Sequence, residues 1–578
     1  MALELAPDMT PAERVDPITL EVIRHGLVAA AEQMAKSIER SSQSQVIREM
    51  LDYSTAVFDT EGGITAQSTR IPMHLNSMTR ALKTLLRAYP VEDWLEGDVY
   101  LTNDPYSGGQ HLPDLQTFAP VFHDGRAIAI AGTLGHHLDV GGRGAGSYGA
   151  DATEIFQEGL RFPPCRIVTA GVPNELFFPV FEANIRVPSK TGSDVRAQIA
   201  ALSIGAADVV RLAQRYGAGT VVAATRQLQS ASERRMGAAI AQLPEGTFVA
   251  EDTVDGDGLD DDPLLVRVAV RREGERLVID FSGTAPQTRG PINCPIASTE
   301  SAAYYAVTAV LDPGVTPNEG AYRPIDVVAP LGSVLNPRFP APVVGRNVFT
   351  HRVATVVMAA LGKALPDRAA AAYYGNSNVY ILSTRDAAGN ANVQFEIEVG
   401  GWGGRQTGDG PDCLSAGIHN LANNPVELVE NEFPMRILRY GLRADSGGAG
   451  RHRGGLGAER SFEVLAECEL SSQFDHVKFP PRGLHGGRDG ATASITVERD
   501  GERRELAGKS LGERLRPGDV VTVLTQGGGG LGAPSERDAD ALAADIRAGK
   551  VTPDAALRDY GDLARRALAR TAPGRAGA

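Results

Sequence analysis

A histidine and a carboxylate, His111 and Asp114, lie three residues apart on either side of Pro113, and a further histidine, His136, follows later in the chain. Two neutral imidazoles and one carboxylate are ligands that zinc, manganese or iron accepts while positions stay open for water or substrate. The proline excludes a regular helix and stiffens the turn between the first two side chains. These residues therefore predict a site for a divalent metal.

Two apolar-rich runs, residues 115–122 and 126–134, surround these candidate ligands and are predicted to form strands. Between the runs stands Asp124-Gly125, a dipeptide that favours a two-residue type I′ turn. The sequence therefore predicts a β-hairpin that begins just after Asp114.

The expected register of this hairpin brings the three ligands together. With Asp124 and Gly125 as the loop, Asp114 lies opposite Gly135, and the residue before it lies opposite His136. His111, Asp114 and His136 then meet at the open end of the hairpin.

Histidines are concentrated in this part of the chain. Four of its eleven histidines lie here: His111, His123, His136 and His137. His123 stands at the turn end, too far along the hairpin to join the others. His137 should point to the opposite face from His136, so it is a candidate for supporting the ligands or for general acid catalysis. His74 is a second candidate catalytic residue that could line the same cavity, and a structural hydrogen bond is its alternative role.

Two glutamates are weaker candidates. Glu154 and Glu158 have the i, i+4 spacing of one helix face, and a solvated face is the plainer interpretation.

Several common signatures are absent from the sequence or lack their structural setting. There is no G-x-x-x-x-G-K-[ST] phosphate loop, no G-x-S-x-G and no H-E-x-x-H. The run 527–532 matches G-x-G-x-x-G, but Ala533-Pro534 interrupts the passage into a helix, so we interpret the run as tight turns. Any ATP chemistry therefore needs a partner.

Composition excludes other classes of function. The 578 residues carry a formal net charge of −14 at a pI near 5.4. An acidic surface argues against nucleic acid and anionic membranes as partners. The sequence contains neither a signal peptide nor an apolar run near the ~20 residues of a membrane span, so a cytoplasmic protein is expected. The four cysteines are scattered singly, which favours buried thiols over a zinc ribbon or a disulfide frame.

The periodicity along the chain predicts an α+β fold with several domains and mixed sheets. Asp16-Pro17 opens a long helix, residues 192–243 are strongly helical, and a hairpin is expected around Glu273-Gly274. Helices at 541–548 and 553–569 form the expected C-terminal tail. We expect a metal-binding α+β domain at 1–245, a mixed β-rich and α domain at 246–534, and a helical tail at 535–578.

Taken together, the motifs of the chain resemble the hydantoinase B / oxoprolinase family. The resemblance is carried by D-Y-S from 52, I-P-M-H-L-N-S-M from 71, N-D-P-Y from 103, H-L-P-D from 111, G-H-H from 135, D-F-S-G-T from 280, G-P-I-N from 290, D-S-G-G-A-G from 445, R-G-G from 453 and the glycine run at 527–530. It covers nearly the whole chain in order.

The resemblance implies a partner and a fourth ligand. Members of the family act with a hydantoinase A-like ATPase subunit, which uses ATP and Mg to phosphorylate the substrate, so a hetero-oligomer is expected. The family's metal motif is similar to His111, Asp114 and His136 here, and it adds Asp52 as the fourth ligand. A cap at the end of a strand is the alternative role of Asp52.

The function that this resemblance implies is that of a B subunit in an ATP-dependent cyclic amide hydrolase of the hydantoinase, 5-oxoprolinase or lactamase type. The metal would assist hydrolysis of the substrate that the A subunit has phosphorylated. The alternative is a subunit of an ATP-dependent ketone carboxylase, similar to acetone and acetophenone carboxylases. A third hypothesis is a non-catalytic scaffold with a structural metal.

Overall fold

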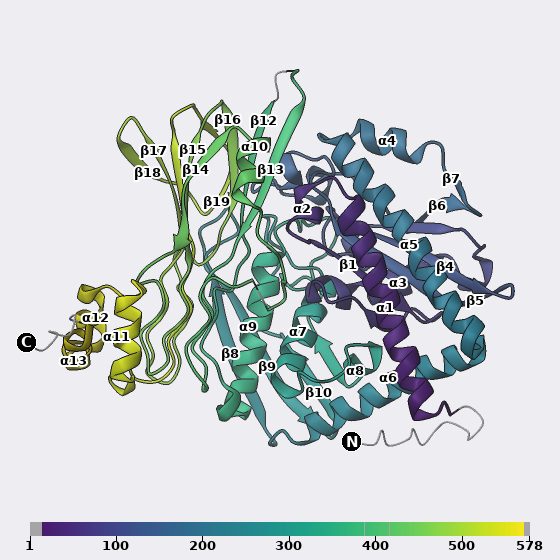
Figure 1. Cartoon of the computed structure of the whole chain (residues 1–578), viewed down its shortest axis with the longest axis horizontal. Coiled ribbons are helices and arrows are strands. Elements are labelled where there is room, and N and C mark those ends of the chain that lie inside the picture. Colours follow the sequence, from purple (N-terminus) through teal and green to yellow (C-terminus); the bar gives the residue numbers. More distant parts are fainter. Residues whose placement is uncertain (1–13, 386–387, 416, 572–578) are drawn as a thin grey trace, which may run out of the picture.

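A computed structural model describes residues 14–385, 388–415 and 417–571 (Figure 1). The chain forms one seven-stranded sheet, two four-stranded sheets and one five-stranded sheet, with helices packed between and beside them. The mixture of helices and several sheets agrees with the predicted α+β class. Within these residues, no helix is both long enough and apolar enough to cross a membrane.

The first sheet positions the predicted ligands. Its strand order is β2-β1-β5-β4-β3-β6-β7, and every neighbouring pair is antiparallel. The strands are β1 (Tyr53–Phe58), β2 (Ile64–Gln67), β3 (Val99–Thr102), β4 (Asp114–His123), β5 (Arg126–His136), β6 (Cys165–Thr169) and β7 (Val172–Pro173).

Helices cover both faces of this sheet, because alternate strand residues enter two different cores. Val57 and Leu115 pack in one core with α1 (Pro17–Ser41) and α5 (Pro188–Tyr216). Phe118 and Leu134 pack in the other core with α3 (Pro72–Ala88). The remaining α-helices before residue 245 are α2 (Gln45–Arg48), α4 (Phe177–Ala183) and α6 (Ala218–Ala241).

The helix predicted after Asp16 is confirmed as α1. The Asp16 carboxylate accepts hydrogen bonds from the amides of Ile18 and Thr19, each 3.1 Å long, which caps the helix, and Pro17 occupies the first turn.

The β4–β5 hairpin differs from its predicted register by one residue over most of its length. Asp124 and Gly125 form the turn with positive φ values of 50° and 73°, as a type I′ turn requires. Beside the turn His123 pairs with Arg126, but a bulge beyond Val121 shifts the register. Asp114 therefore lies opposite His136, not opposite Gly135. The bulge inserts one unpaired residue, which the turn alone could not indicate.

The second sheet has the order β11-β10-β9-β8. Its strands are β8 (Thr247–Val254), β9 (Leu264–Glu273), β10 (Arg276–Asp280) and β11 (Ile325–Val328), and α7 (Ile296–Leu311), α8 (Glu319–Tyr322) and α9 (Asn347–Ala364) accompany them. The hairpin predicted around Glu273-Gly274 is confirmed as β9–β10, and because Glu273 pairs with Arg276 its two-residue loop is Gly274-Glu275.

One core cluster connects this sheet with the first. It packs Phe118 and Met78 with Val268 and Val353, so it draws on both sides of residue 245. The division of the chain at 245 and 534 stays a prediction.

The last two sheets have the orders β13-β12-β16-β19 and β14-β15-β20-β17-β18. They are built from β12 (Asn378–Arg385), β13 (Ala391–Glu398), β14 (Met435–Leu442), β15 (Ala458–Val464), β16 (Cys468–Gln473), β17 (Ser494–Arg499), β18 (Glu502–Glu505), β19 (Lys509–Leu515) and β20 (Val520–Leu524). The short helix α10 (Val426–Glu432) lies between β13 and β14 in the chain.

Glycine-rich segments join these sheets through close backbone contacts. Gly528 donates its amide hydrogen to the carbonyl oxygen of Gly455 at 2.9 Å. A Cβ atom on Gly528 would lie 2.0 Å from the carbonyl oxygen of Trp402, so no larger residue fits there without movement. Neighbouring backbone thus encloses the run. Residues 527–530 form neither a turn nor a bend, and the amides from Gly527 to Gly530 donate to backbone carbonyls far along the chain. The interpretation of this run as tight turns is therefore wrong for these four glycines, and only Gly532 at the end of the run, with a φ of 74°, lies in a bend.

Three short helices, α11 (Ala539–Arg547), α12 (Pro553–Tyr560) and α13 (Asp562–Thr571), follow the last sheet and lie at the opposite side of the molecule from α1 and α5 (Figure 1). The second predicted helix is divided at Gly561, whose φ is 55°. The helices share a small core that also contains Ala449.

Candidate metal centre

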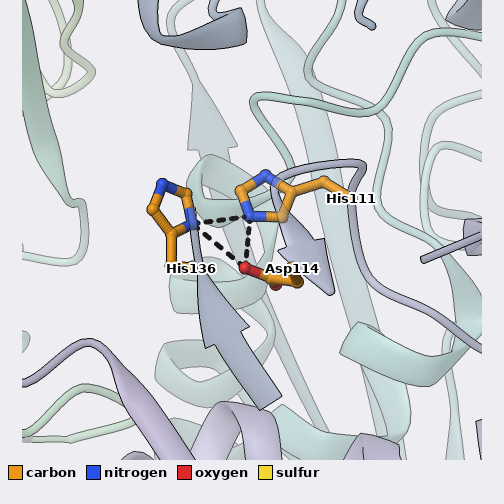
Figure 2. Close-up of side chains that lie close together, drawn as sticks. All are labelled: His111, Asp114 and His136. Atoms are coloured by element: carbon orange, nitrogen blue, oxygen red, sulfur yellow. Dashed lines mark hydrogen bonds and ion pairs between the residues drawn. The ribbon is translucent and has the colours of Figure 1, made fainter. Parts of the chain in front are cut away.

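The open end of the β4–β5 hairpin brings His111, Asp114 and His136 together (Figure 2). Asp114 begins β4 and lies opposite His136, the last residue of β5, so the two side chains share one face of the sheet. His111 reaches the same point from the turn before β4. All three side chains are buried, Asp114 completely.

The three ligand atoms converge on one another. His111 Nε2 lies 2.9 Å from Asp114 Oδ1, His136 Nδ1 lies 3.0 Å from the same oxygen, and the two ring nitrogens are 3.2 Å apart. Atoms that bind one ion at about 2.1 Å stand roughly 3.0 Å apart at a right angle and roughly 3.4 Å apart at a tetrahedral angle. The spacing fits a shared divalent ion.

The proton on His111 supports the same conclusion. Its Nδ1 hydrogen donates to the carbonyl oxygen of Val344 at 3.0 Å, so a neutral ring presents the Nε2 lone pair to Asp114. Burial and the Arg346 charge lower the pKa of His111 to about 4, which disfavours a second proton. A lone pair and a carboxylate oxygen 2.9 Å apart repel each other, and a cation bound by both removes the conflict.

Arg346, at the start of α9, holds the other oxygen of the carboxylate. Its Nη2 donates to Asp114 Oδ2 at 2.7 Å, and both side chains are buried. Burial opposes ionisation of Asp114, yet the His111 ring, once it is protonated in acid, and the Arg346 guanidinium hold the pKa of that carboxyl well below its ordinary value. The carboxylate therefore stays charged, with Oδ1 directed at the two imidazoles.

Asp52 and His74 lie beside this cluster. Asp52 precedes β1, and its Oδ1 lies 3.5 Å from Nε2 of His74 in the first turn of α3. Burial raises the pKa of Asp52 to about 6 and lowers that of His74 to about 3. Among the described residues, the converging set comprises only the two histidines and Asp114, so Asp52 as a fourth ligand stays a prediction.

His137 lies on the opposite face of the sheet, as its position after His136 predicts. Its Nε2 is 2.8 Å from Oε1 of Gln198 on α5, and the side chain is completely buried. It does not line the cavity that contains the other candidates. At this position His137 can support the end of the sheet that carries His136.

A cavity of about 30 Å³ lies against the ligands, which is room for one or two waters. Its wall includes Asp52 and His74 on one side and Arg346, Ser377 and His419 on another. Asp52, His111 and His136 thus face a small chamber with both polar and apolar side chains in its wall, which residues before 149 and after 345 build together.

The match to a family model decides which family this site belongs to. The hydantoinase B/oxoprolinase model matches residues 16–534. The chain belongs to this family. A relative from Pseudomonas sp. (strain NS671), described as the B component of a D-/L-hydantoinase, is 35% identical over 572 residues, which cover 96% of this chain and 96% of that protein.

Two solved structures resemble this hydantoinase B family member over almost its whole length. The ATP-dependent caprolactamase from Pseudomonas jessenii superposes with a TM-score of 0.88 at 30% sequence identity. The superposition covers 97% of this chain and 100% of the caprolactamase chain. A nucleotide-free acetone carboxylase superposes with a TM-score of 0.87 at 18% identity, covering 97% and 84% of the two chains. At that lower identity the likeness concerns the fold alone.

Several residues of the hydantoinase B site carry no local signal in the sequence. Arg346, Ser377 and His419 reach the cavity from loops or element ends far from the hairpin. Glu158 was expected on a solvated helix face, and this expectation is wrong. It is completely buried after a single 3₁₀ turn, and its Oε1 accepts hydrogen bonds from the amides of Val343 and Val344.

Glu158 gives a pH-dependent prediction. Burial raises its pKa from 4.5 to about 8, so its contribution to stability is complete below pH 4.5 and is lost as the pH rises through 8. Glu158→Gln mimics the protonated acid. We expect urea unfolding to show similar free energies at pH 5 and a variant more stable than the wild type by on the order of 2 kcal/mol at pH 9. Stability profiles that stay parallel from pH 5 to pH 9 would contradict this assignment.

Proposed function

We propose that this chain is the B subunit of an ATP-dependent cyclic amide hydrolase and completes the hydrolysis of a substrate that a hydantoinase A-like ATPase subunit has phosphorylated. The observation that carries the proposal is the buried pair of imidazole nitrogens directed at one carboxylate oxygen. The absence of a phosphate-binding loop from the sequence supports a separate ATPase subunit. A cytoplasmic hetero-oligomer, with ATP and Mg on the partner, is part of the same proposal.

His111, Asp114 and His136 would hold the ion, with Asp52 as the proposed fourth ligand. A divalent metal bound there, zinc, manganese or iron, supplies Lewis acidity, which lowers the pKa of water and polarises the substrate oxygen. Arg346 fixes the carboxylate and keeps it ionised. His74 is neutral, because burial lowers its pKa to about 3, and it lines the cavity beside Asp52.

The size of the cavity bears on substrate entry. About 30 Å³ holds water but not a cyclic amide, so the wall must move when the substrate binds. Residues 417–425, which carry His419 and Leu421 into the wall, form neither helix nor strand and are the natural part to move.

The direct test is to coexpress the chain with its A-like subunit and to measure bound metal and turnover. We expect about one divalent ion per chain, and ATP-dependent ring opening with a substrate among hydantoin, 5-oxoproline and lactams. The complex should elute as a hetero-oligomer in size-exclusion chromatography. Absence of metal from both chain and complex, or full activity of the lone monomer, would refute the proposal.

The fold likeness to acetone carboxylase supports a second candidate, a subunit of an ATP-dependent ketone carboxylase. The same complex distinguishes the two functions when it is offered a ketone with bicarbonate. Carboxylation without opening of any cyclic amide would favour the second candidate.

A further inference from the structure

A second polar cluster lies in the wall of the metal-site cavity. Ser377, just before β12, and His419, between β13 and α10, both line this cavity, and Ser377 Oγ is 2.6 Å from His419 Nε2. His351 on α9 lies behind them, with its Nε2 3.1 Å from each of these two atoms. All three side chains are buried.

A tyrosine extends the cluster into the core. Tyr373 Oη lies 3.1 Å from His351 Nδ1 and 3.3 Å from the backbone carbonyl oxygen of His351. The Tyr373 ring stacks on Trp402, with ring centroids 5.2 Å apart, which fixes the hydroxyl in place. Tyr373, His351, Ser377 and His419 therefore form one continuous chain of hydrogen bonds that ends at the cavity.

Two arrangements of hydrogens connect the four side chains. In the first, Tyr373 donates to the His351 carbonyl, His351 Nδ1 donates to Tyr373, Ser377 donates to His351 Nε2, and His419 Nε2 donates to Ser377. This arrangement leaves a lone pair on His419 Nδ1. In the second, each side-chain hydrogen bond runs the other way, and His419 Nδ1 carries the hydrogen.

His419 Nδ1 has no hydrogen-bond partner within the part of the chain that the structure describes, although it is buried. Burial and the Arg346 charge lower the pKa of His419 to about 3, so the ring is neutral at pH 7 and, in the first arrangement, carries its lone pair on Nδ1. The first arrangement of hydrogen bonds stays the same when His419 is protonated at Nδ1, because the imidazolium still donates from Nε2 to Ser377. The cluster is thus built to hold an imidazole that gains and loses a proton at Nδ1.

The proposed reaction needs such a group. Water adds to the carbon that carries both the phosphorylated oxygen and the ring nitrogen. If the bond to the phosphorylated oxygen breaks, phosphate leaves with the electron pair, the cyclic amide returns, and ATP is consumed without ring opening. If the C–N bond breaks, its electron pair goes to nitrogen, which must receive a proton, and an acyl phosphate remains for a second water to hydrolyse.

We propose that His419 delivers this proton. Its Nδ1 takes one proton from the water as the C–O bond forms and passes it to the nitrogen. It then takes the remaining hydroxyl proton as the carbonyl of the acyl phosphate forms and passes that proton to the nitrogen as the C–N bond breaks, which returns the ring to its neutral state. Ser377 and His351 are positioning residues that hold the ring through Nε2. The inference rests on the proposed function, and it makes His419 the residue that couples ATP consumption to ring opening.

The test uses His419→Gln and Ser377→Ala in the complete complex with the A-like subunit and the cyclic amide that the wild type opens. Phosphate release, ring-opened product and bound metal are measured, and recovered substrate is analysed for ¹⁸O after reaction in H₂¹⁸O. For His419→Gln we expect ring opening to fall by about 10²-fold or more and phosphate release by less than about 10-fold. Metal content should not change, and ¹⁸O should enter the recovered substrate. Ser377→Ala should show the same uncoupling to a smaller degree.

His123→Gln is the matched control, because this histidine lies at the turn end of the β4–β5 hairpin and pairs only with Asp124 among the described acidic residues. This variant should couple phosphate release to ring opening as the wild type does. Equal losses of phosphate release and ring opening in His419→Gln would show a structural role and overturn the inference, with the proposed function intact. A wild-type complex that carboxylates a ketone and opens no ring would overturn both.

Discussion

Replacing Asp114 with asparagine is expected to abolish metal binding and to lower ring opening by about 10⁴-fold, equivalent to ~5.5 kcal/mol of transition-state stabilisation. Arg346 donates to Asp114 Oδ2 at 2.7 Å, so the amide oxygen of the variant should take that place. The amide NH₂ group would then face His111 Nε2 and His136 Nδ1, which lie 2.9 and 3.0 Å from the other oxygen. Two donors would meet the lone pairs that otherwise bind the ion, so the variant should fold without metal.

Asp124→Asn is the control for this substitution, since it makes the same chemical change in the same hairpin. Asp124 lies at the turn with 92% of its side chain exposed, and asparagine tolerates its positive φ. Elemental analysis should find metal in the control and none in Asp114→Asn, and both should unfold cooperatively on heating. One equivalent of tightly bound metal in Asp114→Asn would refute the ligand assignment. Metal loss that abolishes folding would favour a structural scaffold.

Local patterns in the sequence were enough to predict the hairpin and the close approach of the three candidate ligands at its open end. The Asp-Gly turn and the apolar runs beside it define both strands, and Pro113 separates two of the ligands within one turn. The bulge beyond Val121 was not predicted, although Pro120 beside it has no amide hydrogen for the strand ladder and proline inside a sheet is typical of bulges.

The rest of the site could not be predicted, because it depends on contacts between distant parts of the chain. Arg346 is separated from Asp114 by 232 positions, and His419 from His351 by 68. No periodicity or turn chemistry connects such residues. Glu158 shows the same difficulty in another form, since its spacing from Glu154 is typical of an exposed helix face although its side chain is buried.

These distant contacts also explain how the two halves of the chain depend on each other. The first sheet supplies the candidate ligands, while the segment before α9 supplies the carbonyl of Val344 to His111 and the guanidinium of Arg346 to Asp114. Glu158 accepts hydrogen bonds from the amides of that same segment. A disturbance at residues 343–346 should therefore reach the metal site directly.

The second large effect is expected for Arg346→Met, which leaves the Asp114 carboxylate buried without its partner. Both side chains of the pair are almost completely buried, at 4% and 0% exposure. Removing one member of such a pair typically costs about 3–5 kcal/mol, so we expect a loss of that size in the free energy of unfolding of the metal-free chain at pH 7. The difference in the free energy of unfolding between the wild type and Arg346→Met should become smaller in acid, because Asp114 becomes protonated in both proteins. Burial opposes ionisation of Asp114, but in the wild type His111 and Arg346 hold its pKa well below the ordinary value.

Bound metal should restore much of this stability, because a cation beside Asp114 Oδ1 supplies the countercharge that Arg346→Met removes. Since a ligand stabilises the folded state according to its affinity, the stability gained on metal loading should be larger in the variant than in the wild type. Arg346→Lys, which keeps the charge but not the planar fork, should lose less in the metal-free form. Urea unfolding of the wild type, Arg346→Met and Arg346→Lys, each with and without metal, measures these differences in stability. An equal loss in Arg346→Met under both conditions would assign Arg346 to packing, because only a charge effect depends on whether a second cation is present.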